Sequence, residues 1–216
     1  MSDLVAIVDY GSGNLRSAQK ALARAASDRR IDARILVTPD PGIVSSAQRV
    51  VLPGVGAFGA CMAGLNRIDG MIAALEHAVL VAKRPFLGIC VGMQLLAEKG
   101  FEFGETQGLG WIPGVVKALA PSDPQARIPH TGWNAVRARA PHPVLASLDH
   151  HPRDFYFNHS FQFVAENDAH VLGVAEHGDR IAAAVGRDNL VGVQFHPEKS
   201  QAAGLALLAD FLAWRP

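Results

Sequence analysis

The stretch Pro85-Phe-Leu-Gly-Ile-Cys-Val-Gly-Met-Gln-Leu-Leu-Ala-Glu98 decides the fold of this chain. It opens with a short apolar run that is typical of a buried strand, and residues 93–98 favour helix. Gly88 and Gly92 flank Cys90, where their conformational freedom permits a sharp, strained turn. The stretch therefore predicts a strand, a tight turn that presents the Cys90 thiol, and a helix whose N-terminus would stabilise a thiolate.

The first half of the chain alternates short apolar runs with helical patterns. Strands are predicted over residues 4–8, 33–37, 49–52 and 86–89, and helices over residues 14–26, 58–66 and 71–82. This order predicts an α/β fold with a mostly parallel central sheet and helices on both faces. In such a sheet, reactive residues gather beyond the carboxyl ends of the strands. Cys90, Val55 and the loop at residues 9–13 all fall at that edge.

The second half reads as antiparallel additions. Strand-like segments cover residues 110–119, 134–138, 154–158, 170–176 and 181–185, with Pro, Gly and Asp between them. Residues 190–194 are expected to rejoin the central sheet, and residues 201–214 to form a closing amphipathic helix. No repeat or long linker divides the chain, so residues 1–216 are predicted to form a single domain.

Composition narrows the class of protein. Twenty basic and twenty acidic side chains cancel, which argues against binding to nucleic acid or to an anionic membrane surface. Two cysteines offer no disulfide framework. The first residues lack the pattern of a signal peptide, and no apolar run approaches the roughly 20 residues that span a bilayer. We therefore expect a soluble, cytoplasmic protein.

A second motif, Gln194-Phe-His-Pro-Glu-Lys-Ser200, supplies the partners that a thiol nucleophile needs. In an extended segment, His196 and Glu198 lie on the same face, and Pro197 keeps the backbone non-helical. His196 is the candidate base, and Glu198 would hold the tautomer and orientation of its imidazole. A structural thiol at Cys90 and a metal site at His196 are the simpler readings. The glycines around Cys90 argue against the first, and the lack of a ligand cluster at zinc spacing argues against the second.

Two other features have ordinary explanations. Cys61 lies on a small-residue helical stretch and is expected to be an inert core thiol, and His150-His151 reads as a solvated loop. Gly11-Ser-Gly13 after the first strand suggests a dinucleotide-binding turn, but it lacks the third glycine and the acid at a strand end.

The motifs around Cys90 and His196 together resemble those of the class I (triad) glutamine amidotransferases. The resemblance runs from about Val5 to about Leu212. It is closest to the branch that serves as the glutaminase subunit of imidazole glycerol phosphate synthase in histidine biosynthesis. Four segments support this branch: Asp9-Tyr-Gly-Ser-Gly-Asn-Leu15, Pro53-Gly-Val-Gly-Ala-Phe58, Pro129-His-Thr-Gly-Trp-Asn134 and Phe157-Asn-His-Ser-Phe161.

The resemblance implies roles for further residues. Cys90, His196 and Glu198 would form the catalytic triad. The backbone N–H groups of Val55 and Val91 would form the oxyanion hole. For Val91, the geometry of the turn after Cys90 independently indicates this role. The substrate glutamine would be held by Gln94, His159, Ser160 and Phe161. The face toward a partner would include Trp133, Asn134, Tyr156 and Lys199.

The implied partner is a cyclase subunit of (β/α)8-barrel type that forms a heterodimer with this chain and receives its ammonia. No cofactor is implied, because the triad carries all of the chemistry.

Simpler readings of the proposed interface residues remain: core aromatics for Trp133 and Tyr156, a turn amide for Asn134, and a solvated charge for Lys199. Gln94 reads equally as an ordinary exposed helix residue.

Three other functions remain open at this point. One is a triad amidotransferase that serves pyridoxal phosphate, aminobenzoate or purine synthesis. Another is a thiol peptidase or stress protein on a related fold, although these often lack the motif that contains Glu198. The third is a non-enzymatic binding module, which labelling of Cys90 by a glutamine-analogue electrophile would exclude.

Overall fold

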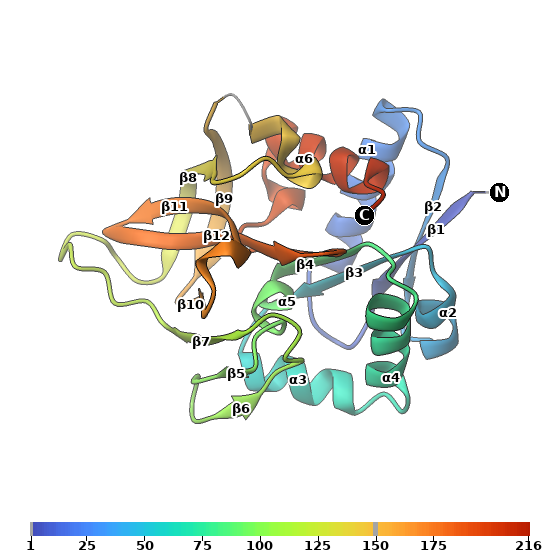
Figure 1. The fold of residues 1–216 in the computed structure, drawn as a ribbon, viewed down its shortest axis with the longest axis horizontal. Helices are drawn as coiled ribbons and strands as arrows, with labels where there is room; N and C mark the ends of the chain where they lie inside the picture. Colours follow the sequence, from blue (N-terminus) through green and yellow to red (C-terminus); the bar gives the residue numbers. More distant parts are fainter. Residues whose placement is uncertain (1, 149–150) are drawn as a thin grey trace.

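The computed structural model describes residues 2–148 and 151–216, which form two sheets and their covering helices (Figure 1). The larger sheet has nine strands in the order β2-β1-β3-β4-β13-β12-β11-β8-β9. In that order they are β2 (Ala33–Thr38), β1 (Asp3–Val8), β3 (Arg49–Gly54), β4 (Phe86–Cys90), β13 (Leu190–Val193), β12 (Asp179–Arg187), β11 (Val171–His177), β8 (His130–Ala138) and β9 (Arg153–His159). The smaller sheet consists of β10 (Phe161–Ala165), β7 (Gly114–Ala118), β5 (Lys99–Gly100) and β6 (Thr106–Gln107).

The first five strands of the larger sheet are parallel to one another, and the remaining four add in antiparallel fashion. The central strands β3, β4 and β13 are buried at every residue, as expected for parallel strands covered on both faces. The four strands predicted in the first half are confirmed. So is the return of the chain to the central sheet, because β13 pairs in parallel with β4.

Helices cover both faces of the parallel part. α1 and α6 pack together on one face, and α2, α3 and α4 lie on the other (Figure 1). The helices are α1 (Leu15–Asp28), α2 (Pro41–Ser46), α3 (Phe58–Asn66), α4 (Met71–Glu76), α5 (Val91–Gln94) and α6 (Gln201–Ala213). A π-helical turn, η1 (His77–Val81), continues α4, and 3-10 turns occur at η2 (Pro143–Leu148), η3 (Asp168–His170) and η4 (Pro197–Lys199). The predicted fold class is confirmed.

The helix predicted over residues 93–98 is wrong beyond Gln94. The carbonyl groups of Leu95 and Ala97 accept hydrogen bonds from the N–H groups of Leu109 and Gly110, so they cannot continue a helical ladder. The side chains of residues 95–97 are fully buried. A returning loop therefore ends this helix after a single turn.

Other predicted boundaries also change. The strand predicted over residues 110–119 is limited to β7, because residues 108–112 form that returning loop. The predicted closing helix is present as α6, but it packs against both α1 and η2, so apolar side chains are buried around most of its surface instead of along one stripe. Of the predicted His150-His151 loop, His151 is exposed, and His150 lies outside the described residues.

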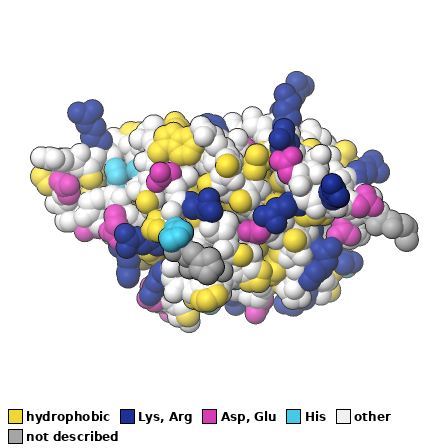
Figure 2. All heavy atoms as spheres, turned by 90° about the horizontal axis from the view of Figure 1, so that it is seen from above, with side chains coloured by type: hydrophobic (Ala, Val, Ile, Leu, Met, Phe, Trp, Pro, Cys, Tyr) yellow, Lys and Arg dark blue, Asp and Glu magenta, His cyan; other side chains and the backbone are white. Residues whose placement is uncertain are grey.

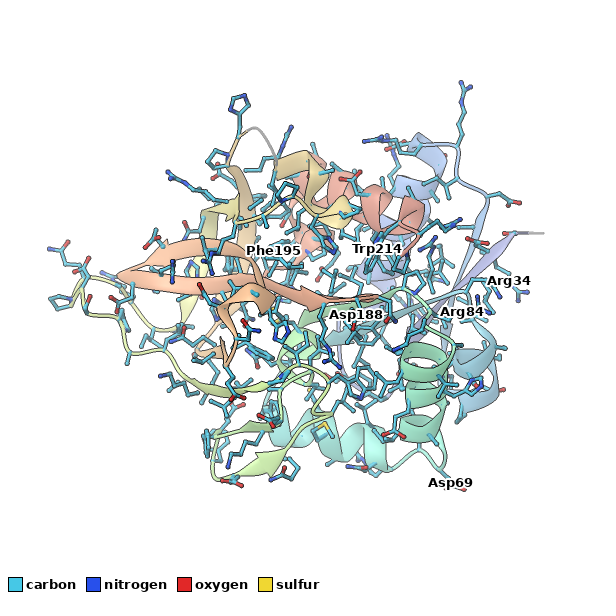
Figure 3. The ribbon with its side chains drawn as sticks, viewed as in Figure 1. Arg34, Asp69, Arg84, Asp188, Phe195 and Trp214 are labelled. Carbon is cyan, nitrogen blue, oxygen red and sulfur yellow. The ribbon has the colours of Figure 1, made fainter. Side chains whose placement is uncertain are left out.

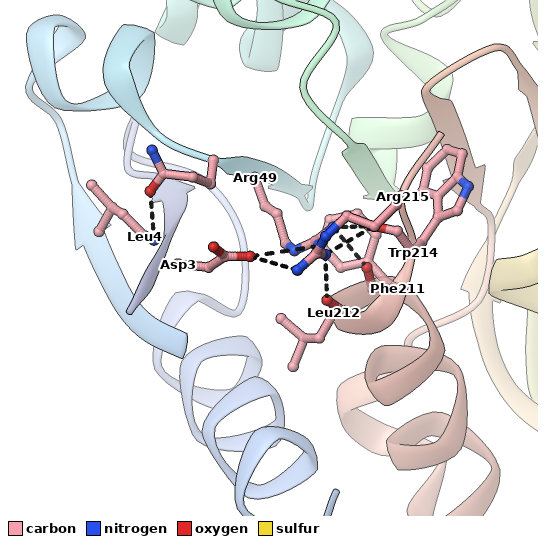
Figure 4. A network of polar contacts seen from close by, with 8 residues as sticks. Asp3, Leu4, Arg49, Phe211, Leu212, Trp214 and Arg215 are labelled. Atoms are coloured by element: carbon pink, nitrogen blue, oxygen red, sulfur yellow. Dashed lines mark hydrogen bonds and ion pairs between the residues drawn. The ribbon is translucent and has the colours of Figure 1, made fainter. Parts of the chain in front are cut away.

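A polar network joins the C-terminal end of α6 to the start of the sheet (Figure 4). The buried Arg49 guanidinium donates to the carbonyl groups of Phe211 and Trp214, at 3.1 and 2.8 Å. Asp3 pairs with Arg215 at 3.0 Å and lies 3.8 Å from Arg49. These contacts hold together the amino-terminal ends of β1 and β3. The predicted reactive residues lie at the other, carboxyl ends of the strands.

The surface agrees with the balanced composition. In Figure 2, basic and acidic side chains are interspersed with apolar ones on the face drawn. Among the described residues, no helix is long and apolar enough to cross a membrane.

Candidate active site

Cys90 lies at the sharp turn between β4 and α5, as the sequence predicts. Its φ of 55° is in the left-handed region, which few residues other than glycine adopt. A Cβ atom at Gly92 would lie 1.8 Å from the Leu52 carbonyl oxygen, and one at Gly88 would lie 2.5 Å from the Gly92 oxygen. Glycine is therefore required on both sides of Cys90 so that α5 can approach β3 and β4 closely.

His196 follows β13 and is fixed by its backbone. Its N–H donates to the Tyr156 carbonyl at 2.9 Å, and its own carbonyl accepts from the Ser200 hydroxyl at 2.6 Å. The preceding residue, Phe195, which is labelled in Figure 3, is fully buried against Phe155 at a ring separation of 4.1 Å. The imidazole is thus held on a rigid segment at the carboxyl edge of the sheet.

His196 and Glu198 form a buried pair. Their Nδ1 and Oε1 atoms are 2.9 Å apart, and the two side chains are only 4% and 2% exposed. Burial alone would lower the pKa of His196, but its interactions with Cys90 and Glu198 raise that pKa to about 9. Burial would raise the pKa of Glu198, but the hydrogen bond and charge of His196 lower it overall. These interactions favour the charged form of the His196 imidazole beside the Glu198 carboxylate.

Asn14 is a further contact of this pair. Its side-chain amide donates to Oε1 of Glu198 at 3.1 Å. It is also the N-cap of α1, yet its side chain makes no capping hydrogen bond to that helix. The first loop of the chain thus helps to hold the acid of the predicted triad.

The Val55 peptide, predicted to supply one oxyanion donor, is engaged by a serine. The Val55 N–H donates to the Ser12 hydroxyl at 3.0 Å, and this hydroxyl donates to the Val55 carbonyl at 2.7 Å. Cys61, confirmed as a buried thiol on α3, lies 3.4 Å from both the Ser12 hydroxyl oxygen and the Val55 carbonyl oxygen. In this structure the Val55 N–H is therefore directed at Ser12.

A cavity of about 570 Å³ opens beside the Cys90 thiol. The predicted residues that line it are Val55, Cys90, Val91, Gln94, His159, Ser160, Phe161, His196 and Lys199. Glu198 lies behind His196, and Trp133, Asn134 and Tyr156 lie outside the lining. Asn14, Phe103 and Asn158 line the cavity as well, although the sequence assigned them no role.

Internal hydrogen bonds limit how two of these side chains can act. Nε2 of Gln94 donates to the Phe161 carbonyl and to Oε1 of Gln194, so Oε1 of Gln94 is the atom available to a ligand. Both ring nitrogens of His159 are engaged, one with the Phe161 carbonyl and one with His130. Any substrate contact by His159 must therefore come from its main chain. Gln94 is buried, not the ordinary exposed helix residue of the simpler reading.

Three of the predicted partner-facing residues form one surface cluster. Trp133 is 50% exposed and meets the half-buried Tyr156 ring edge to face, with ring centroids 6.1 Å apart. Nζ of Lys199 lies 5.6 Å from the centre of the Tyr156 ring. Asn134 lies within β8 and not in a turn, and its amide donates to the Glu176 carbonyl at 2.7 Å. Phe103, at the cavity, is 94% exposed.

The donor set does not suggest a metal. Within residues 2–148 and 151–216, no three His, Cys, Asp or Glu side chains gather as they would around a metal ion. The loop at residues 11–13 holds Val55 through Ser12, and the next residue, Asn14, reaches Glu198. The loop and the residue after it therefore contact residues of the candidate site.

Comparison with known proteins agrees with this fold. The family described as Glutamine amidotransferase class-I matches residues 6–214. "Crystal structure of glutamine amidotransferase" is similar in fold, with a TM-score of 0.70, 17% identity, and coverage of 97% of this chain and 99% of that one. A glutamine amidotransferase from Thermotoga maritima has a TM-score of 0.63 and 17% identity, with 92% and 77% coverage.

The chain therefore belongs to the class I glutamine amidotransferase family. Within that family it is similar to proteins named imidazole glycerol phosphate synthase subunit HisH. The one from Rhodospirillum rubrum is 56% identical over 213 residues, and the one from Caulobacter vibrioides is 55% identical over 212. Each alignment covers 98% of this chain and 99% of the relative.

Proposed function

We propose that this chain is the glutaminase subunit of an imidazole glycerol phosphate synthase and acts in histidine biosynthesis. Relatives with that name share more than half of their residues with this chain over nearly its whole length. The observation that carries the chemistry is the meeting of Cys90 and His196 at one cavity from distant parts of the sequence, with Glu198 bonded to His196 behind it. All 216 residues are proposed to act as one amidotransferase domain in the cytoplasm.

The reaction follows acyl-transfer chemistry. The Cys90 thiolate attacks the side-chain amide carbon of glutamine, and His196 gives its proton to the departing ammonia. His196 then takes a proton from water, whose oxygen attacks the thioester and releases glutamate and the thiolate. Glu198 keeps the imidazole oriented and stabilises its charged form, which agrees with the raised pKa of His196. The sum is glutamine and water converted to glutamate, ammonia and a proton, and no cofactor enters.

The oxyanion of each tetrahedral intermediate needs two N–H donors, for which we propose Val55 and Val91. The Val91 N–H follows the nucleophile at the start of α5. The Val55 N–H has to leave Ser12 before it can serve. Substrate glutamine is proposed to bind through Oε1 of Gln94, which accepts from the α-ammonium group, and through the segment His159-Ser-Phe161.

Ammonia released into water at neutral pH becomes mostly ammonium, so a protein that consumes it must sit at the cavity. We propose a cyclase of (β/α)8-barrel type that forms a heterodimer with this chain. It would convert a ribulosyl aminoimidazole carboxamide nucleotide to imidazole glycerol phosphate and an aminoimidazole carboxamide ribotide.

The proposed docking face is the cluster of Trp133, Tyr156 and Lys199 together with Asn134. Alanine at Trp133, Tyr156 or Lys199 is expected to weaken association or to uncouple glutamine hydrolysis from product formation. Titration of the labelled cyclase measures this, with Gln48→Glu as a control at the opposite edge of the sheet. Wild-type affinity and coupling in all three variants would remove the interface.

The central test of the function uses Cys90→Ala in complex with the cyclase. Glutamine-dependent product formation should be lost, and the reaction driven by added ammonium salt should remain near the wild-type rate. A glutamine-analogue electrophile should label the wild-type chain at Cys90 and not at Cys61. Glutaminase activity retained by Cys90→Ala would refute the assigned nucleophile. Consumption of a different acceptor would assign the chain to another pathway.

A further inference from the structure

The buried amide of Gln194 faces the nucleophile. Its Nε2 lies 3.7 Å from the Cys90 sulfur, within the range of an N–H donor to sulfur, and the side chain is completely buried. The mechanism above gives Gln194 no part. Because an amide can present either its N–H or its oxygen, the consequence for the sulfur depends on what sets the orientation of this amide.

The orientation follows from the Phe161 carbonyl, which can only accept. Nε2 of Gln94 donates to that carbonyl at 3.1 Å, so the N–H side of the Gln94 amide is fixed. The second N–H of the same nitrogen donates to Oε1 of Gln194 at 3.0 Å. With its oxygen turned toward Gln94, Gln194 must direct its N–H group at Cys90.

The Phe161 carbonyl is itself held from the other side. His159 donates to it through Nδ1 at 2.8 Å. His159 must therefore accept at Nε2 from Nδ1 of His130, at 2.9 Å, and His130 in turn accepts from the Asn134 amide at 3.1 Å. Burial lowers the pKa of His130 to about 3 and that of His159 to about 4, so both rings stay neutral and the donor directions persist at neutral pH.

We propose that Gln194 is a hydrogen-bond donor to the Cys90 thiolate, and that Gln94 and the Phe161 carbonyl are positioning groups that fix its direction. The inference rests on the proposed role of Cys90 as nucleophile. It adds a neutral donor to the sulfur, which also interacts with the titratable side chains of His196 and Tyr10. A hydrogen bond to a charged group is strong enough to favour the thiolate over the thiol.

The test is the pH dependence of Cys90 alkylation by iodoacetamide, with the modified peptide identified by mass spectrometry so that Cys61 is counted separately. Gln194→Met removes the donor at similar size, and Gln194→Glu replaces it with a group that carries only acceptors when ionised. The alkylation midpoint should rise by roughly one pH unit in the first variant and further in the second. The kcat/KM for glutamine at pH 7 should fall at least about tenfold in both.

Gln48→Glu makes the same amide-to-acid change far from Cys90, where Oε1 of Gln48 accepts from the Leu4 N–H and Nε2 donates to the Ser46 carbonyl, and it should leave the midpoint unchanged. Thermal unfolding checks that each variant is folded. If Gln194→Glu does not fold, the test is made with Gln194→Met alone. An unchanged midpoint in folded Gln194→Met would overturn the inference while leaving the proposed function standing. Wild-type Cys90 that resists alkylation at every pH would overturn both.

Discussion

At the scale of single residues, the pair of His196 and Glu198 links protonation to stability. The folded-state pKa of His196 is about 9, above its unfolded value of roughly 6.5, so its contribution is complete below pH 6.5 and is lost as pH rises toward 9. The pKa of Glu198 is lowered, so its contribution is present above its unfolded value of roughly 4.3 and is lost as pH falls. Both contributions to stability are therefore fully present only between roughly pH 4.5 and 6.5.

Glu198→Gln should therefore reduce the free energy of unfolding most in that window and progressively less toward pH 9. Urea unfolding of the wild type and the variant across this range measures the difference. A difference that stays constant from pH 5 to pH 9 would show that the charge of Glu198 does not stabilise the fold.

His196 and Glu198 should contribute unequally to turnover. In the proposed mechanism His196 transfers protons, whereas Glu198 orients the imidazole and has help from the Asn14 amide. By analogy with a serine-protease triad, His196→Ala should lower kcat by roughly 10⁶-fold and Glu198→Gln by roughly 10⁴-fold. Steady-state hydrolysis of saturating glutamine compares them, with the fold verified by circular dichroism. Equal losses would mean that Glu198 does more than orient.

The sequence alone singles out the residues of the proposed triad, because each lies in a short motif with chemical meaning. Gln194 and Asn14 were inside quoted motifs, yet their roles depend on distant partners, Cys90 and Glu198. Ser12 is a similar case, since nothing in Gly11-Ser-Gly13 indicates that its hydroxyl meets the Val55 peptide. Contacts between motifs far apart in sequence need the fold before they can be seen.

At the scale of elements, the contact between α5 and β3 depends on Gly92. A methyl group there would lie 1.8 Å from the Leu52 carbonyl oxygen, and backbone on both sides leaves no room for adjustment. Gly92→Ala should reduce the free energy of unfolding by about 3 kcal/mol or more, or prevent folding. Gly173→Ala is the matched control, because its nearest neighbour would lie at an ordinary 3.4 Å. Equal stability of the two variants would contradict the close approach.

The strands of the parallel sheet could be predicted because they are short apolar runs bounded by turns. The short helix α2 was missed, although Asp40 accepts from the N–H groups of Gly42 and Ile43, and Pro41 occupies the first turn, which is a readable start signal. Residues 95–98 favour helix locally, but the returning loop at residues 108–112 takes their carbonyl groups. In residues 95–98 tertiary hydrogen bonds override the local helix propensity, and a single sequence does not reveal such bonds.

At the scale of the whole molecule, the Ser12 contact predicts that the chain alone is a poor glutaminase. The Val55 N–H is directed at Ser12, and Gly54 and Gly56 on either side of Val55 allow its peptide to reorient. The cyclase with its nucleotide bound should release the peptide, and the gained donor accounts for a factor of roughly 10²–10³. Hydrolysis by the free chain, the complex, and the complex with acceptor nucleotide measures the activation. Equal turnover in all three would contradict it.

A side-chain variant separates this contact from other effects of the partner. Ser12→Ala removes both hydrogen bonds and should raise the activity of the free chain by up to roughly 10²-fold. Ser12→Thr keeps the hydroxyl and should stay near the wild-type rate. Unchanged activity in Ser12→Ala would mean that the serine does not hold the Val55 peptide in its resting orientation.

The hydrogen bond between Asn14 and Glu198 spans 184 residues of the chain, and Gln194 lies 104 residues after Cys90. During synthesis at roughly 5–20 residues per second, the ribosome makes the thiol roughly 5–20 s before β13, the strand that His196 follows. Until β13 pairs with β4, the parallel sheet keeps an open edge beside the nucleophile, and such non-local pairing forms slowly. A nascent chain thus carries the cysteine without its proposed general base, and glutamine hydrolysis is expected to begin only when late-made segments have closed against the first loop.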